Sequence, residues 1–422
     1  MVLRNGYKQT SLGQFPFEWK VASIQALIDN NTIVGHLDGN HGALYPRSNE
    51  FKDDGVPYVS ATDFVSGTVD YASCKFLSEE RANQFQKGFA QDGDVLFAHN
   101  ATVGPVAILK TELQYVILST TATYYRCNSN HLSNIFLKYA LQAPYFVKQY
   151  QSVMAQSTRF QVPITAQRKF SIVLPELPEQ TAIATALSDA DALISSLEKL
   201  IEKKRAIKQG AMQELLKPKE GWVVKKLGEI ADISGAGVDK KITPGELPIT
   251  LVNYMDVYKR DYIYRTELNH VVTAPPSKVI NCNVNKGDIL LTPSSELRTD
   301  IGVSAIAMKD LEGVVYSYHL YRLRYFNKVD FLFGLYMLKT RSFLSQPEVM
   351  CEGSGKRYVV SMGKFRKMKV YLPKTISEQE EISKTLWDMD SEISSLEQNL
   401  TKYKMLKQGM MQELLTGKTR LI

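Results

Sequence analysis

Two long stretches of the chain place apolar residues at alternating intervals of four and three positions. This spacing aligns them along one narrow edge of an α-helix. The apolar positions are Ile183, Leu187, Ala190, Ile194, Leu197 and Ile201 in the first stretch, and Ile382, Leu386, Met389, Ile393, Leu396 and Leu400 in the second. A seam this narrow favours packing against another helix rather than a sheet, and each stretch is the available partner of the other. We therefore predict two long helices that form a coiled coil.

The two predicted helices belong to a longer internal repeat. Residues 194–216 and 393–415 are identical at 14 of 23 positions without a gap. Further matches pair Trp19 with Trp222, Gly93–Ala98 with Gly287–Thr292, Leu174-Pro175 with Leu372-Pro373, and Glu179-Gln180 with Glu378-Gln379. The repeat predicts four parts in order, which are a first domain at 1–174, a central helix at 175–217, a second domain at 218–372 and a distal helix at 373–422.

The segments outside the long helices combine short strands with helical periodicity. Residues 57–60, 94–97 and 288–291 are mostly apolar runs bounded by Gly, Asp or Pro, which is typical of strands. Residues 134–152 and 330–346 follow a helical pattern. The predicted fold class is therefore α+β, with two similar mixed α/β domains and two long helices in a pseudo-two-fold arrangement.

Composition and charge narrow the class of protein only moderately. The chain has 422 residues, of which 44% are hydrophobic and 23% charged, as in globular proteins with sizeable cores. It contains no apolar run of the ~18 residues that a membrane span needs, and its N-terminal segment lacks the apolar region of a secretory signal. The four cysteines are widely separated, so we expect reduced thiols and a cytoplasmic location. The net charge of +7 is compatible both with an ordinary surface and with a polyanionic partner.

Motifs of catalytic and metal sites are missing from the sequence. The stretch GSGKRY at Gly353–Tyr358 lacks the first glycine and the final Ser or Thr of a phosphate-binding loop, positions held by Met350 and Arg357. The six histidines show neither HxxxH nor HExxH spacing, and there is no GxSxG turn. We therefore expect no catalytic residue, no metal and no cofactor in this chain, which indicates a recognition or scaffold protein.

The doubled pattern LP…EQ…I…L…I…LE…KQG.MQELL resembles the specificity (S) subunit of type I restriction–modification systems. The stretch MQELLTGKTRLI at 411–422 is similar to the usual end of that family, and YKQTSLGQFPFEWKV at 7–21 is similar to its usual beginning. The resemblance covers essentially the whole chain and follows the family's order of recognition domain, helix, recognition domain, helix. Each motif is weak alone, but the doubled set at matched spacing is specific.

The resemblance implies a DNA-binding subunit that is not an enzyme. Its two target-recognition domains would each read one half of a split, asymmetric site on double-stranded DNA, and its two helices would pack antiparallel as a spacer. The partners it implies are two methyltransferase (M) subunits, which carry S-adenosylmethionine and methylate adenine, and two restriction (R) subunits, which use ATP and Mg for cleavage. No membrane partner is implied. The residues by themselves leave open a second class, a non-catalytic two-domain coiled-coil adaptor that binds protein or RNA.

Two segments in each domain are candidates for DNA contact. Polar side chains such as Asn and Arg reach base edges, while Lys and Arg also bind phosphates. The loop after each GD[VI]L strand supplies His99, Asn100 and Thr102 in the first domain, and Ser294, Ser295, Arg298 and Thr299 in the second. The basic loop before each Leu-Pro supplies Thr158 and Arg159 in the first domain, and Lys356 and Arg357 in the second. The alternative interpretation of these residues is a solvated surface loop or an ion pair within the domain.

If the helices act as a spacer, their length sets the gap between the two half-sites. Inserting four residues after Ala190, about one helical turn, is expected to lengthen the preferred gap. The gap is measured by mapping methylated adenines in cells that express the variant with its partner subunits. Methylation that keeps the original gap would contradict the spacer role.

Overall fold

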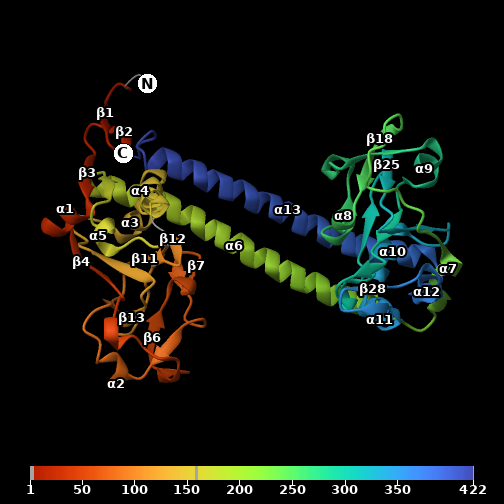
Figure 1. The fold of residues 1–422 in the computed structure, drawn as a ribbon, viewed down its shortest axis with the longest axis horizontal. Coiled ribbons are helices and arrows are strands. Elements are labelled where there is room, and N and C mark those ends of the chain that lie inside the picture. The colour runs from red at the N-terminus through yellow and green to blue at the C-terminus, as the bar shows by residue number, and fades with distance from the viewer. Residues whose placement is uncertain (1–3, 157–159, 422) are drawn as a thin grey trace. The chain divides into compact units, whose positions relative to one another are not determined.

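The structure is a computed structural model that describes residues 4–156 and 160–421. Its contacts define two compact units, one formed by Met1–Lys199 with Gln398–Ile422 and the other by Leu200–Glu397. Each unit holds one mixed α/β domain together with part of each long helix, which the colours of Figure 1 allow the reader to follow. Within the described residues, no helix is both long enough and apolar enough to span a membrane.

The domain of the first unit is built on two β-sheets. The larger sheet has the order β4 (Ile33–Asp38), β14 (Ala122–Cys127), β11 (Val95–Asn100), β12 (Thr102–Ile108), β8 (Thr68–Val69) and β7 (Phe64–Val65). The smaller sheet has the order β10 (Phe89–Ala90), β13 (Val116–Leu118), β6 (Val56–Val59), β9 (Lys75–Leu77) and β5 (Phe51–Lys52). The remaining elements include the pairs β1 (Tyr7–Thr10) with β2 (Gly13–Pro16) and β3 (Lys20–Ser23) with β15 (Ser171–Leu174), and the short helices α1 (Ile24–Asp29), α2 (Glu79–Ala82) and α5 (Ile164–Gln167).

The domain of the second unit follows the same plan. One sheet has the order β17 (Ala231–Ser234), β26 (Tyr321–Tyr325), β22 (Ile289–Leu291), β24 (Ser304–Ala307) and β19 (Tyr262–Ile263). The other has the order β20 (Val271–Ala274), β18 (Leu247–Val252), β25 (Leu311–Tyr316) and β21 (Asn283–Val284). The remaining elements include the pair β16 (Val223–Lys226) with β29 (Lys369–Leu372), and the short helices α7 (Leu227–Ile230), α8 (Tyr254–Tyr258), α9 (Pro276–Asn281) and α12 (Met362–Lys367).

The two domains share one strand order. The run β4-β14-β11-β12 corresponds to β17-β26-β22-β24, and the run β10-β13-β6-β9 corresponds to β21-β25-β18-β20. The matching central pairs, β6 with β13 and β18 with β25, are both parallel. The aspartate of each Gly-Asp turn forms an equivalent ion pair, Asp94 with Arg126 at 2.8 Å and Asp288 with Arg324 at 2.6 Å. These features confirm the predicted pair of similar mixed α/β domains.

The helical stretches predicted at 134–152 and 330–346 are each divided into two helices. They are α3 (Asn134–Ala140) and α4 (Pro144–Ala155) in the first unit, and α10 (Phe331–Leu338) and α11 (Arg341–Met350) in the second. The first break lies at Ala143, which is extended with a ψ of 146° because it precedes a proline. The second lies at Thr340, which is also extended and caps the next turn with its side chain. The helical character predicted for both stretches is confirmed, and the structure adds one break to each.

The two long helices are α6 (Leu177–Leu215) and α13 (Ile376–Leu414), each of 39 residues. Of the predicted seam residues, Ile183, Leu187, Ile201, Ile382, Leu386 and Ile393 are buried. The others are half-buried, namely Ala190, Ile194, Leu197, Met389, Leu396 and Leu400. This burial is what an apolar seam between packed helices requires, and it comes from side chains three and four residues apart.

In each unit the two helix segments run antiparallel. From the first to the last ion pair of each unit, the residue number on α6 increases while that of its partner on α13 decreases. In the first unit the ion pairs are Asp191 with Lys407 at 2.5 Å and Glu198 with Lys404 at 2.7 Å. In the second unit they are Lys204 with Glu392 at 2.7 Å, Arg205 with Glu397 at 2.5 Å, and Lys208 with Asp390. The coiled coil is therefore a shared element, to which each helix contributes its N-terminal part in one unit and its C-terminal part in the other.

A partly buried aspartate joins the helices to the domain in each unit. The groups involved are Asp191, Lys407 and Tyr139 in the first unit, and Asp390, Lys208, Tyr336 and Tyr262 in the second. Tyr139 Oη donates to Asp191 at 2.7 Å, and Tyr336 Oη donates to Asp390 at 2.8 Å. Burial alone would raise the pKa of Asp191, but the bonds from Lys407 and Tyr139 outweigh burial and lower it. A charged carboxylate thus binds a lysine of the other helix and a tyrosine of the domain at once.

The start of each long helix is fixed to its domain by a second pair of equivalent contacts. The side-chain contacts are Trp19 Nε1 to Glu179 at 2.9 Å and Trp222 Nε1 to Glu378 at 3.0 Å. The adjacent glutamines accept backbone N–H groups, Gln180 from Ser133 at 3.0 Å and Gln379 from Asp330 at 2.9 Å. These contacts explain why the tryptophan and the Glu-Gln pair occur in both halves of the repeat.

The junction at Asp390 is open to a direct test of stability. Asp390→Asn keeps the shape of the side chain but leaves Lys208, whose side chain is 14% exposed, without a charged partner. We expect a loss of about 2 kcal/mol in the free energy of unfolding, measured by thermal or denaturant unfolding of the full chain. The matched control is Asp388→Asn, which breaks only an exposed pair with Lys384 and should cost less than about 0.5 kcal/mol. Equal effects of the two substitutions would contradict the junction's role.

Candidate nucleic-acid interface

The structure brings the two candidate segments of the second domain side by side. The segment after the Gly-Asp strand forms β23 (Ser294–Ser295), which pairs with β28 (Arg357–Val359) of the basic loop. Strand β27 (Glu352–Ser354) completes this small sheet, and a backbone bond from Val360 N to Pro293 O at 2.8 Å continues it. Residues about 60 positions apart in the sequence therefore form one continuous surface.

The guanidinium of Arg357 is held by protein groups on this surface. Its Nε and Nη2 donate to Ser294 Oγ at 3.2 and 2.9 Å. Its Nη2 also lies 3.3 Å from Nδ1 of His319. Burial, together with the positive charges of Arg357 and Lys240, lowers the pKa of His319. A neutral imidazole has one nitrogen free to accept, so His319 is suited to bind this arginine.

The side chain of Arg298 lies in a different environment. Arg298 begins a short 3₁₀ turn, η5 (Arg298–Asp300), and is exposed. Its guanidinium carbon lies 4.7 Å from the centre of the Tyr358 ring, which stacks beneath it. At the end of the turn, Tyr258 Oη donates to the Asp300 carboxylate at 2.8 Å. The turn is thus attached to the domain at Asp300, while Arg298 faces outward.

The equivalent segments of the first domain meet in the same way. Asn100 forms a bridge with Gln161, and Val162 N donates to His99 O at 2.8 Å, which matches the bond between Val360 and Pro293. Between β11 and β12, Ala101 has a φ of 63°, which allows the chain to turn tightly there. The predicted contact residues Thr158 and Arg159 lie outside the described residues.

The predicted DNA-contact residues differ in how far they reach the surface. Arg298, Thr299, Lys356 and Arg357 are exposed, as is Thr102, while Asn100 and Ser295 are half-buried and His99 and Ser294 are buried. The Nδ1 of His99 lies 2.9 Å from Thr123 Oγ1, and burial lowers the pKa of His99 to about 4. The His99 side chain therefore supports the loop from inside the domain, as Ser294 does by binding Arg357.

Two residues of the interface in the second domain, His319 and Tyr358, were not selected from the sequence. His319 binds Arg357, and Tyr358 lies under Arg298. Tyr358 adjoins the basic loop and could have been included for that reason. His319 lies 38 residues from its partner, and no motif marks it.

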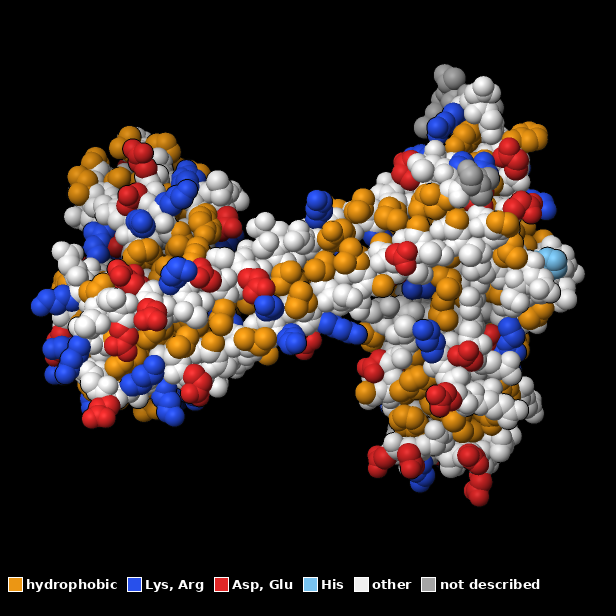
Figure 2. Space-filling model, turned by 180° about the vertical axis from the view of Figure 1, so that it is seen from behind, with side chains coloured by type: hydrophobic (Ala, Val, Ile, Leu, Met, Phe, Trp, Pro, Cys, Tyr) orange, Lys and Arg blue, Asp and Glu red, His pale blue; other side chains and the backbone are white. Residues whose placement is uncertain are grey.

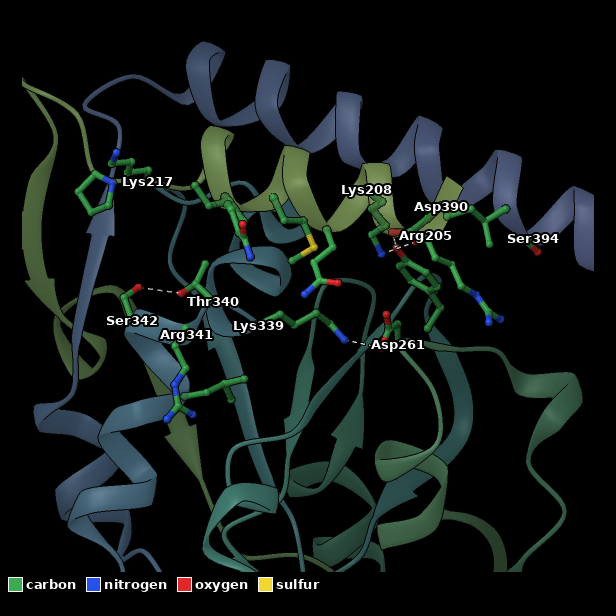
Figure 3. A pocket seen from close by; sticks show the side chains of 18 of the residues that line it. Arg205, Lys208, Lys217, Asp261, Lys339, Thr340, Arg341, Ser342, Asp390 and Ser394 are labelled. Atoms are coloured by element: carbon green, nitrogen blue, oxygen red, sulfur yellow. Dashed lines mark hydrogen bonds and ion pairs between the residues drawn. The ribbon is translucent and has the colours of Figure 1, made fainter. Parts of the chain in front are cut away.

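Charge alone does not mark a DNA-binding surface on the face shown in Figure 2, where Lys and Arg side chains are mixed with Asp and Glu over each unit. Much of the basic charge is also paired. A cavity of about 880 Å³ in the second unit, shown in Figure 3, is lined by Arg205, Lys208 and Lys339, each with an acidic partner on its wall. This cavity belongs to the junction of the helices with the domain, rather than to the recognition loops.

Comparison with known proteins identifies the family. The family described as "Type I restriction modification DNA specificity domain" matches residues 34–209 and 219–403. A putative type I restriction enzyme MjaX specificity subunit of Methanocaldococcus jannaschii is 24% identical over 98% of this chain and 96% of its own length. The MjaVIII specificity subunit of the same organism is 24% identical over 50% of this chain and 48% of its own length.

Solved structures share the fold. The S subunit of a type I restriction–modification system from M. genitalium has a TM-score of 0.57 at 14% identity, covering 98% of both chains. A chain from a structure described for the complex assembly and conformational transition of the type I R-M system has a TM-score of 0.53 at 16% identity. That match covers 96% of this chain and 99% of the other. The likeness shows that this chain, with its two mixed domains and two long helices packed together, shares their fold.

The chain belongs to the type I restriction–modification DNA specificity family. It is the DNA specificity subunit of such a system, and a specificity subunit is itself non-catalytic. Its contribution to the reaction is therefore the recognition of DNA.

The buried histidines of the first domain predict a dependence of stability on pH. Burial lowers the pKa of His36 and of His99 from the ordinary 6.5 to about 4. Between those values the unfolded chain binds protons that the folded domain does not, so stability falls as the pH falls. For each histidine, the slope of the free energy of unfolding against pH is at most about 1.4 kcal/mol per pH unit.

His99→Asn removes one of these titrating groups and should flatten the acid dependence of unfolding by up to that slope. The free energy of unfolding, measured between pH 4.5 and 7, gives the comparison. His131→Asn alters an exposed histidine of the same domain and serves as the control. An unchanged slope in the His99 variant would show that its burial does not control the acid response.

Proposed function

We propose that this subunit reads a bipartite, asymmetric target on double-stranded DNA, with one half-site bound by each domain. The recognition domains are residues 1–174 and 218–372, and the helical segments 175–217 and 373–422 form the spacer. The observation that carries the proposal is the doubled loop pair. The bonds Val162 to His99 and Val360 to Pro293 occupy the same place in both frameworks, while the side chains around them differ. Equal frameworks with unequal loops suit two half-sites of different sequence.

The contact surface in each domain combines a polar loop with a basic one. In the first domain we assign it to Asn100, Thr102, Thr158 and Arg159, with His99 as internal support. In the second we assign it to Ser295, Arg298, Thr299, Lys356 and Arg357, with Ser294 as internal support. Basic groups on phosphates supply affinity, and polar groups on base edges supply discrimination.

The helices are suited to fix the gap between half-sites. A helix of 39 residues is about 58 Å long at ~1.5 Å per residue. Half-sites one turn of DNA apart are separated by about 34 Å, so part of such a helix suffices as a spacer. The seam that joins α6 to α13 and the aspartate junctions resist bending of this spacer.

The partners follow from the doubled framework. Two equivalent junctions of helices and domain, at Asp191 and at Asp390, suit two copies of one partner. We assign these partners as two M subunits, which carry S-adenosylmethionine and methylate adenine. Two R subunits with ATP and Mg would add cleavage to the assembled complex. All bond-making and bond-breaking then takes place in the partners, and this chain directs it to the target.

The test is methylation mapping in a host that expresses the chain with its cognate M subunit. We expect N6-methyladenine within a single motif of two short half-sites separated by a fixed gap. Replacing residues 219–370 with those of a related subunit should change one half-site and leave the other and the gap unchanged. A complex that assembles but methylates no split motif, or a replacement that alters both halves, would contradict the proposal.

A further inference from the structure

Two arginines lie at the recognition loops of the second domain, and they differ in how many of their N–H groups are free. We propose that Arg298 reads a guanine in the half-site bound by this domain, whereas Arg357 binds the DNA backbone. The inference rests on the proposed function and adds to it the identity of one base pair and the residue that selects it.

A guanine presents two acceptors, O6 and N7, in the major groove. An arginine reads both at once with N–H groups on two different nitrogens. The guanidinium has five such groups in a planar fork. An arginine whose fork is already bound to protein acceptors cannot make this pair. An arginine whose fork is free and rests on an aromatic ring is suited to this pair. The ring already restricts the guanidinium, so little freedom of orientation is lost on binding.

The fork of Arg357 is largely occupied. Ser294 Oγ accepts from Nε and Nη2 at 3.2 and 2.9 Å, and His319 Nδ1 lies 3.3 Å from Nη2. Two contacts at Nη2 use both of its N–H groups, and Nε has only one. Nη1 alone has no partner among the described residues. The free Nη1 can bind a single acceptor, such as a phosphate oxygen. A pair with guanine O6 and N7 needs two nitrogens on one edge, either Nε with Nη2 or Nη1 with Nη2. Both edges include Nη2, which is already occupied.

The fork of Arg298 is open. Within residues 4–156 and 160–421, its guanidinium forms neither a hydrogen bond nor an ion pair, and it stacks on Tyr358 at 4.7 Å. The carboxylate of Asp300, two residues further along the chain, accepts instead from Tyr258 at 2.8 Å and from Thr299 at 3.2 Å. All five N–H groups of Arg298 are therefore available, on a side chain that is oriented by the ring beneath it.

The neighbouring contacts keep the two roles separate. Tyr358 directly follows Arg357 in β28, so the ring under Arg298 and the clamped Arg357 belong to one short strand. That strand pairs with β23, which carries Ser294. The positions of both arginines are thus set by a small sheet whose backbone bonds do not involve either guanidinium.

The inference predicts a base-specific effect for Arg298 and a uniform effect for Arg357. Arg298→Ala should reduce discrimination against the wrong base at one G·C pair by roughly 5- to 150-fold. Arg357→Ala should weaken binding to all sequences and reduce the salt slope of log affinity by about one unit. Arg298→Lys keeps the charge but lacks the planar fork, so it should lose discrimination and retain most of the affinity.

The experiment uses the full chain co-expressed with its M subunit, with N6-methyladenine mapped genome-wide for the wild type and each variant. For Arg298→Ala and Arg298→Lys we expect methylation to spread to sites altered at one guanine of the second half-site, with the first half-site unchanged. For Arg357→Ala we expect the wild-type motif at a lower methylated fraction. Arg341→Ala, which removes a side chain 77% exposed outside the recognition loops, is the matched control and should leave motif and fraction unchanged.

Three results would overturn the inference. The first is a wild-type second half-site without a guanine. The second is an unchanged motif in both Arg298 variants whose complexes still assemble and methylate. The third is relaxation at a guanine in Arg357→Ala instead. A wild-type complex that yields a split motif preserves the proposed function in each of these cases. A wild-type complex that yields no split motif contradicts both.

Discussion

The structure depends on a carboxylate that belongs to one helix and is neutralised by the other. Asp191 on α6 takes its charge partner from Lys407 on α13, and Asp390 on α13 takes its partner from Lys208 on α6. Each carboxylate also accepts a tyrosine hydroxyl from the adjoining domain. An ionised group that is partly buried requires such partners, since removing one leaves a charge with poor solvation. The helices cannot separate, nor the domain turn on them, without breaking these contacts.

The same arrangement explains the division of the chain into framework and loops. Strand order, the Gly-Asp turns and the tryptophan contacts at the helix starts are equal in the two units because they hold the fold. The segments between β11 and β12, and between β22 and β24, differ in length and composition. Under the proposed function, the differing loops would serve two unlike half-sites, while the equal framework keeps the two folds alike.

The sequence was informative where the structure follows a local rule. The seam of α6 and α13 was predictable because helix period and apolar spacing coincide over many turns. The break at Thr340 was not, because neither Gly nor Pro marks it in the sequence, and only the extended backbone of one residue divides α10 from α11. In the interface, the loops could be located from the Gly-Asp and Leu-Pro repeats. That His99 points inward, or that His319 binds Arg357, depends on strand pairing over long sequence separations, which no local pattern encodes.

The turn η5 of the second domain is attached at Asp300 by side chains from outside the turn. Tyr258 holds the carboxylate of Asp300, and Thr292 Oγ1 donates to its carbonyl at 3.1 Å, while Arg298 and Thr299 lie exposed. Exposed substitutions away from anchoring contacts usually change stability by less than about 0.5 kcal/mol. If the exposed residues read DNA as proposed, replacing them would alter what the domain reads at almost no cost to folding. For a lineage under pressure to change its DNA target, this separation would make new specificities accessible by single mutations, with the scaffold inherited intact.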